Sequence, residues 1–375
     1  MLPGATIGVL GGGQLGRMMA LAARRMGYKL VALDPSSSCP TAQVADGVVC
    51  GALDDVEAAT RLAESCDVVT LDTEHVPHEL LAKLAEITPV RPGASVLANI
   101  NDRQRQKEFL DRIGVPQARW RPVTDDAHLA AAAREFGGTA VLKARRAGYD
   151  GKGQARLRSP DDAAAARAEI RGAEAIVEEL VPFAREISVI LARGLAGDLA
   201  IYPVAENVHR RGILHTTRAP APISAAQRQR AEQIAVRVAE SLGHVGVIAV
   251  EMFELADGRL LVNEIAPRTH NSGHYTYGAC ATTQFEQHVR AICGLPLGDP
   301  RALTGAVMVN LMGDLWRDGP PAWQRVLSRP DAHLHLYGKA EASPGRKMGH
   351  VLLLDDDTDR ALANAEQLVQ SLGST

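Results

Sequence analysis

Residues 7–19, which read IGVLGGGQLGRMM, constrain the fold of this chain more than any other segment. A short apolar strand runs into glycines at positions 11, 13 and 16, and a helical pattern begins at Leu15. The next apolar stretch ends at Asp34, 18 residues after Gly16. This spacing is typical of a dinucleotide-binding turn, in which glycines allow a tight bend, a helix N-terminus receives a pyrophosphate and an acid binds a ribose hydroxyl. The segment predicts a Rossmann-like domain and raises the question of a nicotinamide cofactor.

The pattern of strands and helices changes three times along the 375 residues, which are too many for one ordinary core. Strands and helices alternate over residues 1–100, so we expect a small parallel sheet covered by helices in a Rossmann-like domain. Residues 101–180 predict a compact α+β lobe with a glycine-rich loop. Residues 181–305 predict long antiparallel strands and one amphipathic helix, and residues 306–375 predict a smaller β-rich segment. The expected fold class is a multidomain combination of α/β and α+β units.

Composition excludes several classes of protein. The formal net charge of −3 argues against a nucleic-acid binder. The longest apolar runs, such as VGVIAV at 245–250, are far shorter than the roughly 20 residues that a membrane span needs. The five cysteines form no C-x-x-C pair, so neither a disulfide framework nor a zinc site is indicated. We therefore expect a cytoplasmic protein without a signal peptide.

The sequence VEMFELADGRLLVNEI, at 250–265, predicts a β-hairpin with Asp257-Gly258 in its turn. Counting outward in equal steps from Ala256 and Arg259 brings Glu251 opposite Glu264. In this register the apolar pairs nearer the turn are Phe253 with Val262 and Leu255 with Leu260, and Asn263 points to the opposite face.

Two carboxylates that face each other on a largely buried surface destabilise a sheet unless a cation lies between them. Carboxylate oxygens with open coordination positions suit Mg²⁺ that also binds phosphate oxygens, better than they suit a closed zinc site. We therefore interpret Glu251 and Glu264 as ligands of Mg²⁺, for which Mn²⁺ could substitute. A solvated face, produced by a one-residue shift of the register, is the alternative that the sequence leaves open.

A cation and a glycine-rich loop could face the phosphates of such a site. Lys143 ends an apolar strand, and the loop GYDGKGQ follows at 148–154. Glycines let backbone N–H groups approach phosphate oxygens and let a loop move as a lid. A surface hairpin tip is the alternative interpretation of the loop alone. The sequence contains neither the P-loop motif nor the protein-kinase motifs.

The strand lysine, the glycine loop, the EEL segment and the paired glutamates together resemble the ATP-grasp superfamily. Within it, GGGQLGRM, GYDGKGQ, NEIAPRTHNSGHYT and QFEQHVRAICGLPLG resemble the 5-(carboxyamino)imidazole ribonucleotide synthase family of bacterial and fungal purine biosynthesis, over residues 7–354. The resemblance implies that ATP, bicarbonate and 5-aminoimidazole ribonucleotide react through carboxyphosphate to give the carboxyamino product, ADP and phosphate. It also implies a homodimer, and an N-terminal glycine turn that helps to hold the ribonucleotide and binds no nicotinamide.

The resemblance further implies an ATP site and a metal site. Lys143 and His209 would contact phosphates, and Glu186 would hold the ribose hydroxyls. The backbone of residues 178–181, a hinge between the two lobes, would bind adenine. Glu251 and Glu264 match the family's magnesium carboxylates. The residues implied for ATP are Arg103, Lys143, Gly148, Tyr149, Asp150, Gly151, Lys152, Gly153, Gln154, Glu178, Glu179, Leu180, Val181, Glu186, His209, Asn263 and Glu264.

The ribonucleotide site implied by the resemblance draws on distant parts of the chain. Its phosphate would lie near Lys339 and Arg346 in the loop YGKAEASPGRKMGH, because basic side chains in such broken loops often bind phosphate monoesters. A solvated basic loop is the alternative. Asp72 departs from the family's usual Glu-x-Glu, which leaves its role in doubt. The implied substrate residues are Glu74, Tyr149, Lys152, Arg268, His270, Lys339 and Arg346, and the implied catalytic residues are Lys143, Lys152, His209 and Arg268.

Three other classes of protein share part of these features. A different ATP-grasp ligase, such as a formate-dependent purine transformylase or a biotin carboxylase, would share Lys143 and the metal carboxylates but should lack the string APRTHNSGHYT. A nicotinamide oxidoreductase explains the N-terminal turn and leaves the facing glutamates unexplained. A catalytically silent nucleotide-binding protein would be expected to lose a metal carboxylate or Lys143, and this chain has both.

Overall fold

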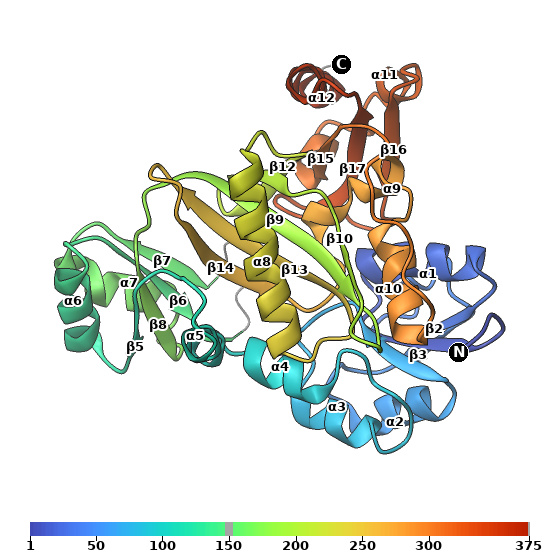
Figure 1. Ribbon diagram of the computed structural model, residues 1–375, viewed down its shortest axis with the longest axis horizontal. Coiled ribbons are helices and arrows are strands. Elements are labelled where there is room, and N and C mark those ends of the chain that lie inside the picture. Colours follow the sequence, from blue (N-terminus) through green and yellow to red (C-terminus); the bar gives the residue numbers. More distant parts are fainter. Residues whose placement is uncertain (147–152, 374–375) are drawn as a thin grey trace.

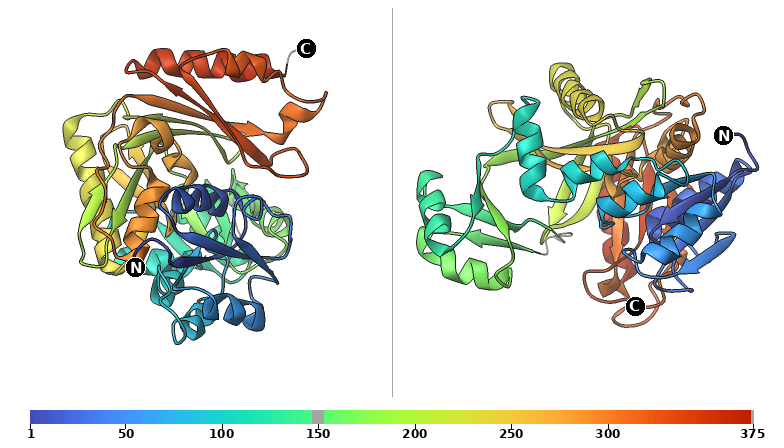
Figure 2. Two further views of the ribbon diagram at one scale, coloured as in Figure 1. Left: turned by 90° about the vertical axis from the view of Figure 1, so that its right-hand side faces the viewer. Right: turned by 90° about the horizontal axis from the view of Figure 1, so that it is seen from below.

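Three β-sheets organise the chain in the computed structural model, which describes residues 1–146 and 153–373 (Figure 1). Two sheets have four strands each and the third has nine. The two small sheets lie at opposite ends of the molecule with the large sheet between them (Figure 2). In the described residues no helix is long and apolar enough to cross a membrane.

The N-terminal sheet is parallel and has the strand order β3-β2-β1-β4. Side chains of β1 alternate between two cores: Ile7 and Val9 pack with Met18 and Met19 of the first helix, whereas Leu10 packs toward the second helix on the other face. This arrangement confirms the Rossmann-like unit. Its elements are β1 (Thr6–Leu10), α1 (Gln14–Arg25), β2 (Lys29–Asp34), β3 (Gly47–Cys50), α2 (Val56–Glu64), β4 (Val68–Leu71), α3 (His78–Leu84) and α4 (Ala94–Ile100).

The second sheet forms a small lobe with the antiparallel order β5-β8-β6-β7. Two helices cover one face and bury a compact core that includes Leu129, Leu142 and Val177. The helix α5 (Arg103–Arg112) precedes the lobe and begins at an N-cap, Asp102, whose side chain accepts the backbone N–H groups of residues 104 and 105. The lobe contains β5 (Trp120–Val123), α6 (Asp126–Glu135), β6 (Ala140–Ala144), β7 (Gln154–Leu157), η1 (Pro160–Asp162), α7 (Ala163–Glu169) and β8 (Ala175–Glu179).

The large sheet has the order β14-β13-β9-β11-β12-β15-β17-β16, and β10 pairs with β9. The C-terminal strands continue this sheet, because β15 pairs with β12. Its strands are β9 (Phe183–Arg193), β10 (Leu199–Ile201), β11 (Ala205–Arg210), β12 (Ile213–Ala219), β13 (Gly246–Leu255), β14 (Leu260–Ala266), β15 (Ala306–Met312), β16 (Ala332–Leu336) and β17 (Lys347–Leu354). The remaining helical elements are α8 (Ala225–Ser241), η2 (Asn271–Gly273), α9 (Thr276–Ala279), α10 (Gln284–Cys293), η3 (Gly313–Trp316), α11 (Gln324–Leu327) and α12 (Thr358–Leu372).

Alternation along the central strands gives two different faces, one that packs against α8 and one that is apolar in one part and polar in another. Ile187, Val189 and Leu191 of β9 pack with Ala235 and other residues of α8, which lies across the sheet in Figure 1. The side chains between them point to the opposite face, as the period of two in a strand requires. That opposite face carries the polar residues described next.

Candidate active site

A cavity of about 280 Å³ lies between the small lobe and the polar face of the large sheet. Four neighbouring strands of the sheet, β14, β13, β9 and β11, contribute Glu264, Glu251, Glu186 and His209 to its lining. The small lobe contributes residues of β6, β7 and β8 and the hinge that follows β8. Of the described residues implied for ATP, all except Gly153 line this cavity: Arg103, Lys143, Gln154, Glu178, Glu179, Leu180, Val181, Glu186, His209, Asn263 and Glu264. Gly148, Tyr149, Asp150, Gly151 and Lys152 lie outside the described residues.

The hairpin formed by β13 and β14 places Glu251 directly opposite Glu264, which confirms the predicted pair. The register nearer the turn is different from the prediction. Phe253 lies opposite Leu261, and the N–H of Leu255 donates to the carbonyl of Arg259 at 2.9 Å. The turn therefore contains one residue more than predicted, and it ends at Gly258, whose φ of 83° suits glycine. The predicted pairs Phe253–Val262 and Leu255–Leu260 are wrong.

A β-bulge between the glutamate pair and the next pair restores the register, because it leaves Asn263 without a cross-strand partner. Asn263 lines the same cavity as Glu264, and its Oδ1 accepts a hydrogen bond from Lys143 Nζ at 3.2 Å. The prediction that Asn263 points to the opposite face is therefore wrong. Strict alternation fails at a bulge, where two successive side chains can serve one site.

Glu251 is a largely buried carboxylate, and one of its oxygens has no hydrogen-bond donor from the residues that the structure describes. Its side chain is 15% exposed, and its Oε1 has no hydrogen-bond partner among the described residues. Burial raises the pKa of Glu251 to about 7; His209 opposes this shift and the Glu264 carboxylate adds to it. Glu264 is held from the other side by Arg103, whose Nη1 lies 3.3 Å from Glu264 Oε2.

These two carboxylates fit a divalent cation that prefers oxygen ligands, because a cation would supply the charge that Glu251 Oε1 lacks. No group of three or more His, Cys, Asp or Glu side chains in the described part of the chain is arranged to hold a metal ion. A cation at the pair would therefore need further oxygens from phosphate and water.

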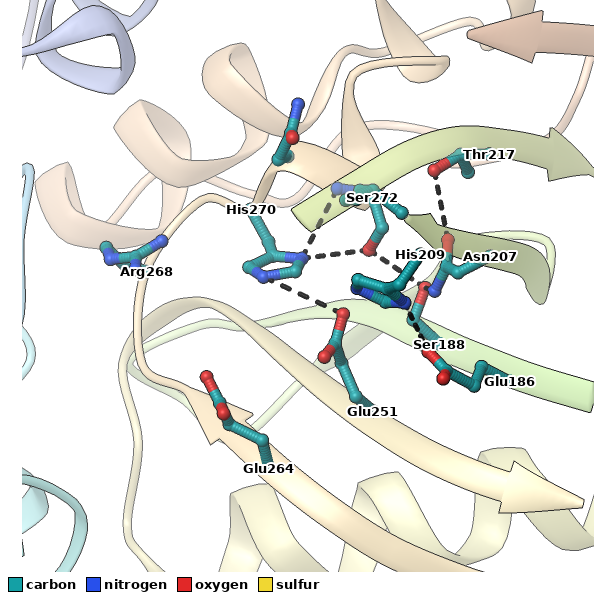
Figure 3. A network of polar contacts seen from close by, with 12 residues as sticks. Glu186, Ser188, Asn207, His209, Thr217, Glu251, Glu264, Arg268, His270 and Ser272 are labelled. Atoms are coloured by element: carbon teal, nitrogen blue, oxygen red, sulfur yellow. Dashed lines mark hydrogen bonds and ion pairs between the residues drawn. The ribbon is translucent and has the colours of Figure 1, made fainter. Parts of the chain in front are cut away.

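A chain of hydroxyl and amide groups fixes the ring of His270 beside Glu251 (Figure 3). His270 Nδ1 accepts the backbone N–H of Ser272 and lies 2.9 Å from its hydroxyl, so the proton of the neutral ring is on Nε2. That Nε2 lies 3.9 Å from Glu251 Oε1. Burial, with a contribution from Arg268, lowers the pKa of His270 to about 3, so the ring is neutral. The chain continues from Ser272 through Ser188, Asn207 and Thr217.

The second histidine of the site, His209, contacts the carboxylate of Glu186 through Nδ1. Burial alone would lower the pKa of His209, but the contact with Glu186 and the charge of Glu251 raise it. The two imidazoles of the site are thus shifted in opposite directions, the pKa of His209 upward and that of His270 downward, because only His209 has a carboxylate partner at contact distance.

Lys143 enters the cavity from β6 and shares a carboxylate with a second lysine. Its Nζ lies 3.0 Å from Glu178 Oε2, and Lys107 Nζ of α5 lies 3.3 Å from the same oxygen. Burial would raise the pKa of Glu178, but Lys107 and Lys143 lower it to about 2. Glu178 Oε1 has no hydrogen-bond partner among the described residues, although it is buried. The site thus has an ionised carboxylate with one oxygen left to accept a hydrogen bond.

The N-terminal glycine turn is occupied by the protein's own carboxylates. Asp72, which follows β4, accepts the N–H groups of Gly13 and Gly16 at the start of α1, and Asp34 accepts the N–H of Gly12 at 2.9 Å. A Cβ atom at Gly13 would lie 2.5 Å from Asp72 Oδ2, so glycine is required for this approach. The N–H groups that a pyrophosphate would use are therefore engaged within the protein.

The residues implied for the ribonucleotide fall into two groups. Arg268 makes a two-point ion pair with Glu74, with Nη2 and Oε1 2.8 Å apart, and both lie close to Glu264. Lys339 Nζ donates to the carbonyl of Lys347 at 2.6 Å, and Arg346 Nη1 donates to the carbonyl of Glu341 at 2.9 Å. Lys339 and Arg346 do not line the 280 Å³ cavity, and Tyr149 and Lys152 lie outside the described residues.

Two further cations lie at or beside this cavity although they were not among the predicted site residues. Lys347 of β17 lines the cavity, whereas the sequence placed it in the basic loop expected near the ribonucleotide phosphate. Lys107 is 2% exposed beside Glu178. A signal for Lys107 existed in the sequence, because it follows Arg103 by four residues, the spacing of side chains that share one face of a helix.

Comparison with known proteins assigns the whole chain to one family. Residues 4–101 match the ribonucleotide synthetase preATP-grasp domain, residues 108–285 the ATP-grasp domain and residues 306–364 the phosphoribosylaminoimidazole carboxylase C-terminal domain. The N5-carboxyaminoimidazole ribonucleotide synthase of Brucella melitensis biotype 1 is 49% identical over 351 residues, which cover 93% of this chain and 96% of the relative.

Solved structures agree with this assignment. An ADP complex of an N5-carboxyaminoimidazole ribonucleotide synthetase superposes with a TM-score of 0.94 at 44% identity, covering 100% of this chain and 99% of the other. The Aspergillus clavatus enzyme in complex with ADP and 5-aminoimidazole ribonucleotide superposes with a TM-score of 0.93 at 33% identity over 100% of both chains. The sequence resemblance is thereby confirmed, and so is the ATP-grasp fold with its preATP-grasp and C-terminal units. The chain is an ATP-dependent ligase and belongs to the N5-carboxyaminoimidazole, or 5-(carboxyamino)imidazole, ribonucleotide synthase family.

Proposed function

We propose that this chain catalyses the reaction of ATP, bicarbonate and 5-aminoimidazole ribonucleotide to N5-carboxyaminoimidazole ribonucleotide, ADP and phosphate in purine biosynthesis. The observation that carries the proposal is the cavity between the lobes, in which the Glu251–Glu264 pair faces the Lys143 ammonium group. The family to which the chain belongs performs this carboxylation. The cavity supplies both the carboxylates and the cations that a metal–nucleotide complex requires.

ATP binds in the 280 Å³ cavity, with adenine at the hinge of residues 178–181 and the phosphates between Lys143 and the two glutamates. The unpartnered Glu178 Oε1 supports this placement, because an ionised carboxylate accepts a hydrogen bond from an amino group of the base. Two of the three donors of Lys143 are directed to Glu178 and Asn263, which leaves one for a phosphate oxygen. Glu186 holds the ribose hydroxyls, and His209 reaches a phosphate. Arg103 and the loop of residues 148–154 complete the site.

Glu251 and Glu264 hold Mg²⁺, or Mn²⁺ as a substitute, and the ion would neutralise charge on the transferring phosphoryl group. The protein's own part is to position the groups. Arg103 fixes Glu264, and the ring of His270 approaches Glu251 from the opposite side. The contact with Arg103 restricts the orientation of the Glu264 carboxylate.

Bicarbonate is a poor electrophile, so an oxygen of bicarbonate first attacks the γ-phosphorus and the bond to ADP breaks. The resulting carboxyphosphate, or CO₂ released from it, then reacts with the ribonucleotide amine, and phosphate leaves. Water must be excluded in between, because it would hydrolyse the intermediate before the amine could react. Arg268, held by Glu74, and the neutral His270 lie between the metal carboxylates and the N-terminal domain, where the amine must arrive.

The ribonucleotide is held by Glu74, Tyr149, Lys152, Arg268 and His270, with its phosphate at Lys339 and Arg346. Lys143, Lys152, His209 and Arg268 carry the catalytic roles. We place the protein in the cytoplasm. We also propose that it is a homodimer, which sedimentation of the purified protein tests directly.

The experiment is an ADP-release assay with ATP, Mg²⁺ and bicarbonate, with and without 5-aminoimidazole ribonucleotide. The expected result is ADP release that depends on the ribonucleotide and is matched by formation of the carboxyamino product. Formate in place of bicarbonate serves as the control. Turnover with formate but not with bicarbonate would assign the chain to a formate-using ligase instead.

A further inference from the structure

The helix α5 delivers two cations to the ATP cavity from one face. Arg103 at its first turn contacts Glu264, and Lys107, one turn later, contacts Glu178. These residues are four apart, so their side chains lie on the same side of the helix. Lys107 differs from Arg103 because it does not line the cavity and is only 2% exposed. Its contact with the site is made by way of the Glu178 carboxylate.

Glu178 is thus shared by two ammonium groups. Its Oε2 lies 3.0 Å from Lys143 Nζ and 3.3 Å from Lys107 Nζ. All three side chains are at least nine-tenths buried, with exposures of 9%, 4% and 2% for Lys143, Glu178 and Lys107. Lys107 Nζ has no hydrogen bond of good geometry among the described residues, although it is close to the carboxylate. A buried lysine is costly to keep in a protein without a paired charge, so its presence requires a reason.

The charge balance of the trio supplies that reason. Two ammonium groups and one carboxylate leave a net charge of +1, and Lys143 is the ammonium group of the two that lines the cavity. If Glu178 had only Lys143 as a partner, the pair would be neutral. The carboxylate would then balance the positive charge of Lys143, and less of that charge would act on an anion in the cavity. A second cation behind Glu178 competes for the carboxylate and leaves the charge of Lys143 available to an anion in the cavity.

We propose that Lys107 is a positioning residue for nucleotide phosphate: by sharing Glu178 with Lys143, it leaves the Lys143 ammonium group uncompensated and directed into the cavity. Lys107 does not touch the nucleotide and acts through Glu178. The inference rests on the proposed placement of ATP in this cavity and adds to it the reason for a second, hidden lysine.

The primary test measures equilibrium binding of MgADP by calorimetry, which needs no turnover. Lys107→Met should weaken MgADP binding on the order of 10-fold, the size typical for loss of a charge-assisted contact. The Michaelis constant for 5-aminoimidazole ribonucleotide should change less than about twofold in the same variant, since that substrate lies elsewhere. Arg105→Met is the matched control, because it removes an exposed cation from the same helix. It should leave both constants unchanged.

A second set of variants separates this role from a merely structural one. Lys107→Arg retains the charge and should bind MgADP more tightly than Lys107→Met and Lys107→Gln. If Lys107→Gln and Lys107→Met bind MgADP as the wild type does, or if Lys107→Arg binds it no more tightly than they do, the inference is wrong.

The two proposals fail in different assays. Absence of ribonucleotide-dependent ADP release in the wild type would overturn the proposed function and leave the MgADP comparison intact. Normal turnover with MgADP binding that is indifferent to Lys107 would overturn only the inference about Lys107.

Discussion

The carboxylate of Asp72 accepts a hydrogen bond from the backbone N–H group of Gly16, at the first turn of α1. In a dinucleotide-binding domain this position belongs to a pyrophosphate. Here the anion is part of the protein and arrives from the end of β4, the neighbouring strand. The glycine turn that follows β1 is therefore hydrogen-bonded to the end of β4 through the Asp72 carboxylate.

Because the N–H groups of the turn already have carboxylate partners, we expect that the protein does not bind NADH. A nicotinamide dinucleotide would have to displace the Asp72 carboxylate from Gly13 and Gly16 and the Asp34 carboxylate from Gly12. The measurement is a fluorescence titration of NADH with the purified protein, with MgADP calorimetry as the positive control. Enhancement of nicotinamide fluorescence with micromolar affinity would contradict our interpretation of the turn.

The metal carboxylates give a second prediction. Glu251→Gln and Glu264→Ala should each lower kcat by roughly 10²-fold or more, because each removes a proposed ligand of the ion at the transferring phosphoryl group. The assay is steady-state ADP release at saturating Mg²⁺.

Glu254→Gln is the matched control for these variants. Glu254 lies three residues farther along β13, pairs with Arg185 at 3.1 Å and does not line the cavity. Its replacement should leave kcat within about twofold of the wild-type value, since Glu254 lies outside the cavity and the new amide oxygen can still accept the hydrogen bond from Gln227 Nε2. Near-normal kcat in both metal-ligand variants would mean that Glu251 and Glu264 do not hold the ion.

The basic loop between β16 and β17 gives a third prediction. Lys339→Ala and Arg346→Ala should raise the Michaelis constant for the ribonucleotide on the order of 10- to 100-fold, because each removes a charged donor to its phosphate. The constant for ATP should change little. Arg346→Lys should rescue only in part, since one ammonium group cannot reproduce the two parallel donors of a guanidinium.

Initial rates with one substrate varied at a time test this prediction. Arg317→Ala, an exposed arginine of the same C-terminal region, is the control. A loss of ATP affinity with an unchanged ribonucleotide constant would assign the loop to the nucleotide instead.

The sequence was most informative where local patterns determine local structure. A glycine-bounded strand and helix predicted the N-terminal unit, and the Asp257-Gly258 turn predicted the hairpin that pairs Glu251 with Glu264. That pair was predicted correctly although the turn is longer than expected, because the bulge at Asn263 compensates for the extra residue. The extra turn residue and the bulge each shift the register by one residue, in opposite directions. Alternation of apolar and polar residues in a sequence reveals neither of them.

Other features depend on contacts between segments that are distant in the chain. Lys107 looks like an ordinary helix lysine until α5 packs on β8 and brings it to Glu178. Asp72 looks like a substitution in a substrate motif until β4 aligns beside β1 and its carboxylate reaches α1. Such roles are created by packing, so a single sequence offers at most a spacing that is compatible with them.

The last prediction concerns acid stability and a histidine outside the active site. His288 of α10 is fully buried; its Nδ1 accepts the backbone N–H of Val247 at 3.0 Å, and its Nε2 lies 2.8 Å from Thr70 Oγ1. The ring is therefore neutral, with its proton on Nε2, and a second proton would break the bond to Val247. Burial, with a smaller contribution from His244, lowers the pKa of His288 to about 3.

Because the folded pKa lies below the unfolded value of about 6.5, the unfolded chain binds the extra proton first as the pH falls. The stability that the neutral ring contributes is fully present above about pH 6.5 and is lost progressively as the pH falls toward the folded pKa. The expected loss from this one residue between pH 7 and pH 5 is about 2 kcal/mol. Urea unfolding at several pH values measures it. His288→Gln should be less stable at pH 7 but should show a shallower pH dependence, by about one proton, whereas His333→Gln, at an exposed position of β16, should retain the wild-type slope. An unchanged slope in His288→Gln would mean that His288 is already protonated in the folded protein.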